Sequence, residues 1–249
     1  DPGRRLPPKV AHAEPLFIDL IRDLGARRGE AEWNLGMGLT DRTSHDEYRL
    51  LVEYEWAPVD RVGVELELPV SLHSALEGTP QVPRDRLDGL KAAVQWTFLV
   101  SEPWQTSAAV GYLTEWRSPM PAAWLGDNPR GVLANPFAVV AHRWPAGWHS
   151  LVLAGARFDR VPGRWKAPVS EFNLSQHYLL PSTRNFVGLE ANALVSRGRW
   201  DVVLRPQMRL AIFEHFLVGI AVSVPATTQR DRERLGTFFR FIYEPGHRK

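Results

Sequence analysis

The sequence predicts an all-β fold, a transmembrane antiparallel up-and-down β-barrel of about 12 strands with a short N-terminal helix. Three observations predict it. Apolar and polar residues alternate through most of the chain after residue 30, short and long connections alternate between these segments, and aromatic residues gather beside the connections. A period of two indicates strands with two different faces. The other two features are typical of barrels that span a lipid bilayer.

Composition limits the alternatives. The chain has 249 residues, of which 44% are hydrophobic and 23% charged, as in ordered proteins. With a net charge of only +2, charge alone argues for neither nucleic acid nor acidic membranes, and no nucleic-acid partner is expected. The chain has no cysteine, which excludes disulfides and thiolate zinc sites and suits passage through an oxidising periplasm. No run of 18 apolar residues is present, so a transmembrane helix is not expected.

Residues 1–29 are predicted to precede the barrel as a lead-in and a helix. Residues 1–14 contain three prolines and no periodicity, which indicates an extended segment. From Pro15, a favourable first residue of a helix, an amphipathic helix is expected to residue 29. Its apolar face comprises Phe17, Leu20, Ile21 and Leu24. This helix would lie in the lumen as a plug or against the inner leaflet outside the barrel.

Residues 30–243 are predicted to form the barrel, followed by a tail at 244–249. Each segment has about the 9 to 11 residues that a tilted strand needs to cross the hydrocarbon core. The facing of two of them, 132–143 and 150–159, is uncertain because they alternate least cleanly. The twelve expected strands are 30–40, 47–57, 61–72, 89–100, 106–116, 132–143, 150–159, 171–180, 186–196, 200–210, 216–225 and 235–243.

The connections favour a membrane barrel over a soluble one. Those after the even-numbered strands are short, as in "APVD", "WPAGW" and "PSTR", whereas most of the others are long and polar, as in "HSALEGTPQVPRDRLDG". Such a barrel has short turns at one end and long loops at the other. A soluble β-sandwich or barrel also alternates. However, twelve strands closed on an apolar interior would enclose more space than these side chains fill.

Two belts of aromatic residues are expected where the barrel meets the membrane interface, because amphipathic rings prefer that boundary. One belt lies beside the short turns: Trp56, Trp104, Trp144, Trp148, Tyr178, Phe213 and Phe216. The other lies towards the opposite rim: Tyr48, Trp116, Phe158, Trp165 and Trp200.

If the apolar face meets lipid, charged residues line the lumen. The second and third strands carry the acidic residues Glu53, Glu55, Glu65 and Glu67, and the other lumen residues singled out are Lys91, Arg205, Arg209 and Arg240. An acidic wall opposite a basic wall orients and filters solutes, so the sequence predicts an outer-membrane channel or transporter for small polar or charged solutes. Alternatively, these charges pair with each other and make a structural barrel with a closed lumen.

Four neighbouring carboxylates repel one another unless a cation lies among them. The arginines of the predicted helix, Arg22, Arg27 and Arg28, would reach the acidic wall if the helix plugs the lumen. A lysine or a divalent cation would also counter this repulsion, since carboxylates are ligands for calcium. Otherwise no cofactor and no metal site are predicted.

An enzyme that modifies lipid or lipopolysaccharide is the alternative from another class. Its candidate catalytic residues are Asn173, Ser175 and His177, which alternate on one face of the eighth predicted strand. This serine and histidine resemble the arrangement in outer-membrane phospholipases, which need a serine or water activated by histidine near lipid. The alternation turns all three residues into the lumen, so a polar lumen row is the preferred interpretation.

Two stretches resemble known proteins. The last strand, "GTFFRFIYEP", resembles the C-terminal signal by which outer-membrane proteins reach the barrel assembly machinery, although "EPGHRK" follows Tyr243 here. The stretch "HAEPLFIDLIRDLGARRGEAEWN" is similar to the start of poorly characterised proteobacterial outer-membrane proteins. These resemblances imply the cell outer membrane of a Gram-negative bacterium. The expected partners are outer-membrane lipid and lipopolysaccharide, the barrel assembly machinery and a small polar solute.

Overall fold

The computed structural model describes residues 6–18, 20–42, 45–75, 85–117, 131–161, 164–227 and 235–245. Its described residues form twelve long strands, two strands of two residues each, β4 (Arg86–Leu87) and β9 (Arg164–Trp165), and the 3-10 turn η1 (Pro145–Gly147). The long strands are β1 (Ala31–Asp41), β2 (His45–Val59), β3 (Val62–Ala75), β5 (Leu90–Ser101), β6 (Thr106–Arg117), β7 (Gly131–Arg143), β8 (Trp148–Val161), β10 (Val169–Leu179), β11 (Phe186–Ser196), β12 (Arg199–Phe213), β13 (Phe216–Pro225) and β14 (Gly236–Tyr243).

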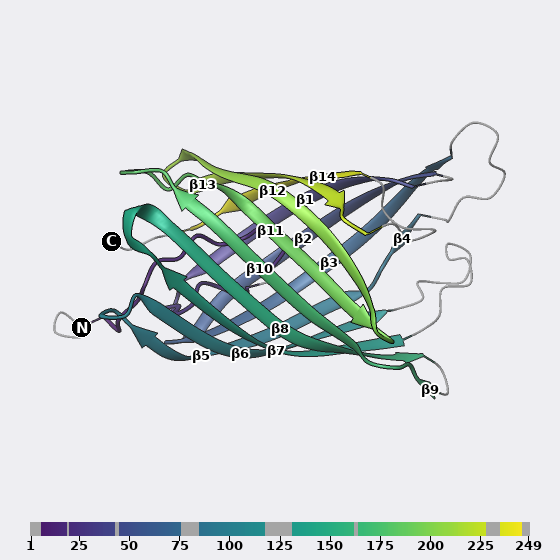
Figure 1. Ribbon diagram of the computed structural model, residues 1–249, viewed down its shortest axis with the longest axis horizontal. Coiled ribbons are helices and arrows are strands. Elements are labelled where there is room, and N and C mark those ends of the chain that lie inside the picture. Colours follow the sequence, from purple (N-terminus) through teal and green to yellow (C-terminus); the bar gives the residue numbers. More distant parts are fainter. Residues whose placement is uncertain are drawn as a thin grey trace.

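Each long strand pairs antiparallel with the next long strand, and β14 pairs with β1, which closes the barrel (Figure 1). The expected twelve-stranded barrel is therefore confirmed, and every predicted segment overlaps one long strand. Ala31 at the start of β1 pairs with Trp56 beside the short β2–β3 turn. The N-terminal segment therefore enters the barrel at the end that carries the short turns.

The outer surface is apolar. Trp33, Leu35, Met37 and Leu39 of β1 are exposed, whereas Glu32 and Asn34 between them are buried. The same alternation continues through β2, β3 and β10. A continuous apolar exterior on a closed sheet suits contact with hydrocarbon.

The two expected belts lie on this exterior. Beside the short turns, Trp104, Trp144, Trp148, Phe213 and Phe216 are exposed, while Trp56 and Tyr178 are half-buried. Towards the other rim, the exposed rings are Tyr48, Trp116, Phe158, Trp165 and Trp200.

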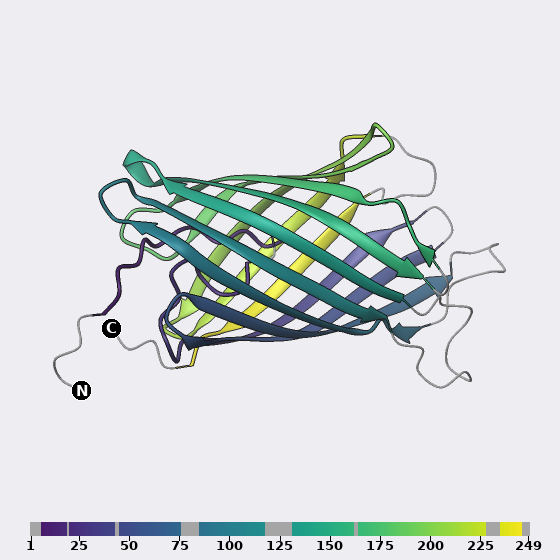
Figure 2. The same ribbon diagram turned by 90° about the horizontal axis from the view of Figure 1, so that it is seen from below.

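The predicted N-terminal helix over residues 15–29 is wrong. The described residues of this segment run as bends and turns inside the barrel (Figure 2). Arg22, Gly25 and Gly29 have φ angles of 63°, 87° and 88°, which no right-handed helix accommodates. No helix of the described residues is long and apolar enough to cross a membrane.

Hydrogen bonds to lumen side chains explain why this segment is not helical. The backbone amides of Ala13, Leu16 and Arg22 donate to His149 Nδ1 at 2.9 Å, Gln207 Oε1 at 2.7 Å and Glu55 Oε2 at 2.9 Å. The amide of Gly25 donates to Thr97 Oγ1 at 3.0 Å. For Arg22 and Gly25, the barrel wall thus satisfies amides that a helix starting at residue 15 would satisfy internally. We call residues 12–25 the plug.

The plug also explains the two strands of uncertain facing. Phe137, Val139 and Ala141 of β7, with Leu151 and Leu153 of β8, point into the lumen and are buried. They form one apolar cluster with residues of the plug: Ile18, Leu20, Ile21 and Leu24. β7 and β8 alternate poorly because they are apolar on both faces, with lipid outside and the plug inside.

Candidate functional site

The four glutamates of the acidic wall lie on the lumen face of β2 and β3. Glu53 of β2 is directly opposite Glu67 of β3, and Glu55 is opposite Glu65. All four side chains are buried. Like charges directly opposite each other destabilise a strand pair, so this wall needs positive charge from elsewhere in the lumen.

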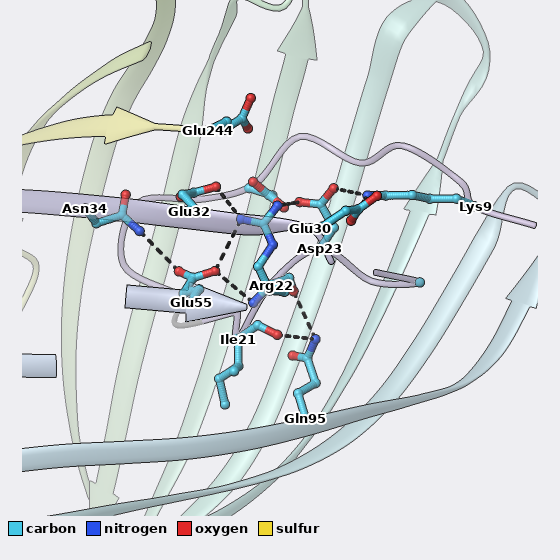
Figure 3. Close-up of polar contacts among 12 residues, drawn as sticks. Lys9, Ile21, Arg22, Asp23, Glu30, Glu32, Asn34, Glu55, Gln95 and Glu244 are labelled. Atoms are coloured by element: carbon cyan, nitrogen blue, oxygen red, sulfur yellow. Dashed lines mark hydrogen bonds and ion pairs between the residues drawn. The ribbon is translucent and has the colours of Figure 1, made fainter. Parts of the chain in front are cut away.

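Arg22 of the plug supplies part of that charge (Figure 3). Its Nη1 donates to Glu32 Oε2 at 2.6 Å and lies 3.7 Å from Glu55 Oε2. Only 1% of Arg22 is exposed. Burial opposes its charge, but Glu32 and Glu55 outweigh burial and raise the pKa of the guanidinium. Gln95 fixes the backbone here, because its Nε2 donates to the Arg22 carbonyl at 3.1 Å.

Lys91 and Arg240 supply the rest. Lys91 Nζ lies 2.7 Å from Glu67 Oε2 and 3.7 Å from Glu65 Oε1, and Arg240 Nη2 lies 3.8 Å from Glu53 Oε2. Carboxylate oxygens of Glu53, Glu65 and Glu67 come within 4.8 Å of one another, a separation that a divalent cation also bridges. A cation there stays a prediction, since Lys91 already places positive charge at this cluster.

On the basic wall, Arg205 and Arg209 of β12 also contact residues of the plug. Arg209 Nη1 lies 2.9 Å from Glu14 Oε2. Arg205 donates to Ser223 Oγ at 3.1 Å and to Asn192 Oδ1, and its guanidinium carbon lies 4.2 Å from the centre of the Phe17 ring. The plug therefore presents an arginine to the acidic wall and a glutamate to the basic wall.

The other two arginines of the predicted helix lie away from the acidic wall. Arg27 Nε donates to the carbonyl of Pro7 at 3.2 Å, and the side chain of Arg28 is exposed at the rim. Lys9 instead binds the plug from the N-terminal side, 2.5 Å from Asp23 Oδ2 and 2.8 Å from Glu30 Oε2. Burial lowers the pKa of Lys9, but the two carboxylates outweigh it and leave the pKa raised.

The three candidate catalytic residues, Asn173, Ser175 and His177, lie on the lumen face of β10 and are buried. Asn173 Oδ1 accepts a hydrogen bond from Asn192 at 3.0 Å, and the His177 ring packs edge-on against Phe186 at 4.6 Å. The wall of the barrel thus separates them from the surrounding lipid.

Between the plug and the end of the barrel with the long connections, the lumen contains a cavity of about 630 Å³. Leu16 and Phe17 of the plug form part of its lining. We call this cavity the vestibule. Its charged lining residues are Glu47, Arg49, Glu67, Arg86, Asp88, Lys91, Glu115, Arg117, Arg157, Arg205 and Arg240.

Sequence reasoning missed several of these residues. Arg49 and Arg117 keep the alternation of Glu53 and Glu115, so the pattern of their strands was sufficient to place them in the lumen. Arg86 belongs to β4, inside a stretch predicted as a loop, and carries no such signal. Glu14 lies in a segment without periodicity, so its contact with Arg209 had no sequence signal either.

Comparison with known proteins places the chain in one family and one fold. A family model described as HAEPLYID-like matches residues 8–244. Those letters match residues 12–19 of this chain, "HAEPLFID", apart from Phe17. Comparison with curated proteins gives no match.

Solved structures share the barrel at low identity. An outer membrane channel from Pseudomonas putida F1 aligns with a TM-score of 0.69 at 11% identity, over 89% of this chain and 98% of that one. The KdgM porin aligns with a TM-score of 0.57 at 10% identity, over 84% and 98% of the two chains. The NanC porin aligns with a TM-score of 0.57 at 9% identity, over 86% and 100%. The fold is that of outer-membrane β-barrels.

Proposed function

The chain belongs to the HAEPLYID-like family, and we propose that it is an outer-membrane channel for small polar or charged solutes in a Gram-negative bacterium. In the conformation described, residues 12–25 close it. The names of three proteins with the same barrel, an outer membrane channel and two porins, support the proposal. Outer-membrane lipid and lipopolysaccharide around the barrel, and the barrel assembly machinery during folding, are partners that belong to the same proposal.

The observation that carries the proposal is an irregular segment inside a barrel whose lumen carries many charged and polar side chains. The plug joins no strand in the part of the chain that the structure describes. Its backbone is bound by side chains of the wall, such as Gln207 and Thr97. Individual contacts of this kind are each worth about 0.5–1.5 kcal/mol, so the plug can leave or shift without disturbing the strand ladder. A wall of charged groups would then line a continuous passage.

The lipid-modifying enzyme is not favoured. Ser175 and His177 are buried inside the barrel, on the face of β10 turned away from lipid. An acyl chain in the membrane would have to cross the strand ladder to reach them. A structural barrel that is permanently closed by ion pairs would show the same contacts between plug and wall as a channel that the plug closes reversibly. A measurement of conductance is therefore needed to distinguish these two hypotheses.

The test is conductance in planar lipid bilayers. We expect the full chain to show low or intermittent current, and a variant without residues 1–25 to show steady ohmic channels. Glu53→Gln with Glu65→Gln, in the variant without the plug, should change the ion selectivity of that current. Absence of current from both the full chain and the shortened variant, with folded barrels, would overturn the proposal in favour of the structural barrel.

A further inference from the structure

The vestibule has the size and enclosure of a binding site. Its volume of about 630 Å³ lies within the roughly 300–1,000 Å³ of pockets that hold small molecules. Residues from many wall strands, β2, β6, β8, β12 and β14 among them, line it. A solute that enters from the end with the long connections meets this cavity before it meets the plug.

The lining of the vestibule is predominantly basic. Seven of its residues are arginine or lysine and four are aspartate or glutamate. The four carboxylates each lie beside a basic residue of the same lining. These pairs are Arg49–Glu47 at 2.9 Å, Arg86–Asp88 at 2.6 Å, Lys91–Glu67 at 2.7 Å and Arg117–Glu115 at 3.2 Å. The lining therefore has three more basic than acidic residues.

The three remaining basic residues lie on three different strands. Arg157 is on β8, Arg205 on β12 and Arg240 on β14. Arg157 has no ion-pair partner among the residues that the structure describes. Arg205 is held in place by Ser223, Asn192 and the Phe17 ring, and Arg240 by Glu53 below the vestibule. Guanidinium groups fixed in this way need little ordering to bind a carboxylate.

We propose that the vestibule binds small soluble organic anions, recognised through their carboxylate by Arg157 and Arg205. This inference rests on the proposed channel function and narrows its solute to anions. Arginine pairs with carboxylate in a planar fork of two hydrogen bonds, and a cavity with more basic than acidic residues in its lining favours a solute of opposite charge. The hydroxyls of Thr40, Ser71, Ser223 and Thr237 also reach this lining and suit a solute with hydroxyl groups.

Binding by the full chain in non-ionic detergent tests this inference, with glucuronate and glucose as matched probes that differ in one carboxylate. We expect saturable binding of glucuronate in titration calorimetry and at least 10-fold weaker binding of glucose. Raising the salt concentration should weaken glucuronate binding, because the attraction is screened.

Variants locate the site. Arg157→Gln with Arg205→Gln should weaken glucuronate binding at least 10-fold. Arg160→Gln on the same strand as Arg157 is the control, because Arg160 is exposed on the outer face over Trp165. Arg157→Gln alone covers the case in which the double variant does not fold, and should weaken binding several-fold.

Equal affinity for the two probes, or an affinity for glucuronate that is unchanged in Arg157→Gln, would overturn the anion site. The binding titration is independent of plug opening. A chain that binds glucuronate yet never conducts contradicts the channel, whereas a chain that conducts without preference for glucuronate contradicts only this inference.

Discussion

Arg22 of the plug donates to Glu32 through its guanidinium, at 2.6 Å, while its backbone amide donates to Glu55 at 2.9 Å. One plug residue thus binds carboxylates on two adjacent strands, β1 and β2. These carboxylates are buried beside Glu53, and buried charges need partners. Glu32 and Glu55 therefore have their guanidinium partner only when the plug is in place, which makes Arg22 the main electrostatic anchor of the closed state.

Replacing Arg22 should open the channel. Arg22→Gln leaves Glu32 and Glu55 without their guanidinium, and removal of one partner of a buried ion pair typically costs about 3–5 kcal/mol. We expect a large rise in the fraction of time that single channels are open in planar bilayers. Arg28→Gln is the matched control, because Arg28 is exposed at the rim. Equal open fractions in the two variants would show that Arg22 does not hold the plug.

The plug should also move in Gly63→Ala. A Cβ at Gly63 on β3 would lie 1.8 Å from the carbonyl oxygen of Ile21, so plug and strand cannot both keep their positions. We expect faster hydrogen–deuterium exchange of backbone amides in residues 16–25, with exchange in the strands unchanged. In Gly38→Ala the nearest atom would be 3.6 Å away, an ordinary contact, so its exchange should match the unsubstituted protein. Unaltered exchange in Gly63→Ala would contradict this placement of the plug.

The barrel and its facing could be predicted from the sequence because lipid and lumen impose opposite polarity on successive residues. This rule placed Glu53, Lys91, Arg205 and Arg240 in the lumen. It failed for Phe137 and Leu151, where the plug makes the inner face apolar. In those strands the inner face is apolar because it packs against plug residues more than a hundred positions earlier in the chain. A local sequence pattern contains no information about such a contact.

The plug itself illustrates the limit of helical periodicity. The spacing of Phe17, Ile21 and Leu24 is helical, but the backbone follows the hydrogen-bonding groups of the lumen instead. Tertiary contacts override a weak propensity of this kind. The prediction that Arg22 reaches the acidic wall depended on opposite charge and on this segment entering the lumen, and neither condition requires a helix.

Glu14 and Arg209 should be energetically coupled in the closed state. Their side chains lie 2.9 Å apart and are mostly shielded from solvent. In a double-mutant cycle of Glu14→Gln and Arg209→Gln, we expect the double variant to be less destabilised than the sum of the single variants. Contacting charges give coupling energies of about 0.5–3 kcal/mol. The free energy of plug closure, obtained from the ratio of closed to open time, is the quantity to compare. Additive effects would contradict the contact.

Acid should favour release of the plug through His12. In the closed state His12 Nε2 lies 3.0 Å from Ser107 Oγ, and the His12 ring meets the edge of His149. Burial, together with the nearby His149, His142 and Arg143, lowers the pKa of His12 from 6.5 to about 4 against an opposing effect of Asp23. The closed state thus favours the neutral ring.

A released plug exposes His12 to water and restores its ordinary pKa, so the released state binds the extra proton below pH 6.5. The open fraction should therefore rise as pH falls from about 6.5 to about 4 and level off outside that window. His12→Gln should flatten this part of the curve, whereas His45→Gln on β2, away from the plug, should keep it. Identical pH curves for His12→Gln and the unsubstituted protein would assign the titration to another group.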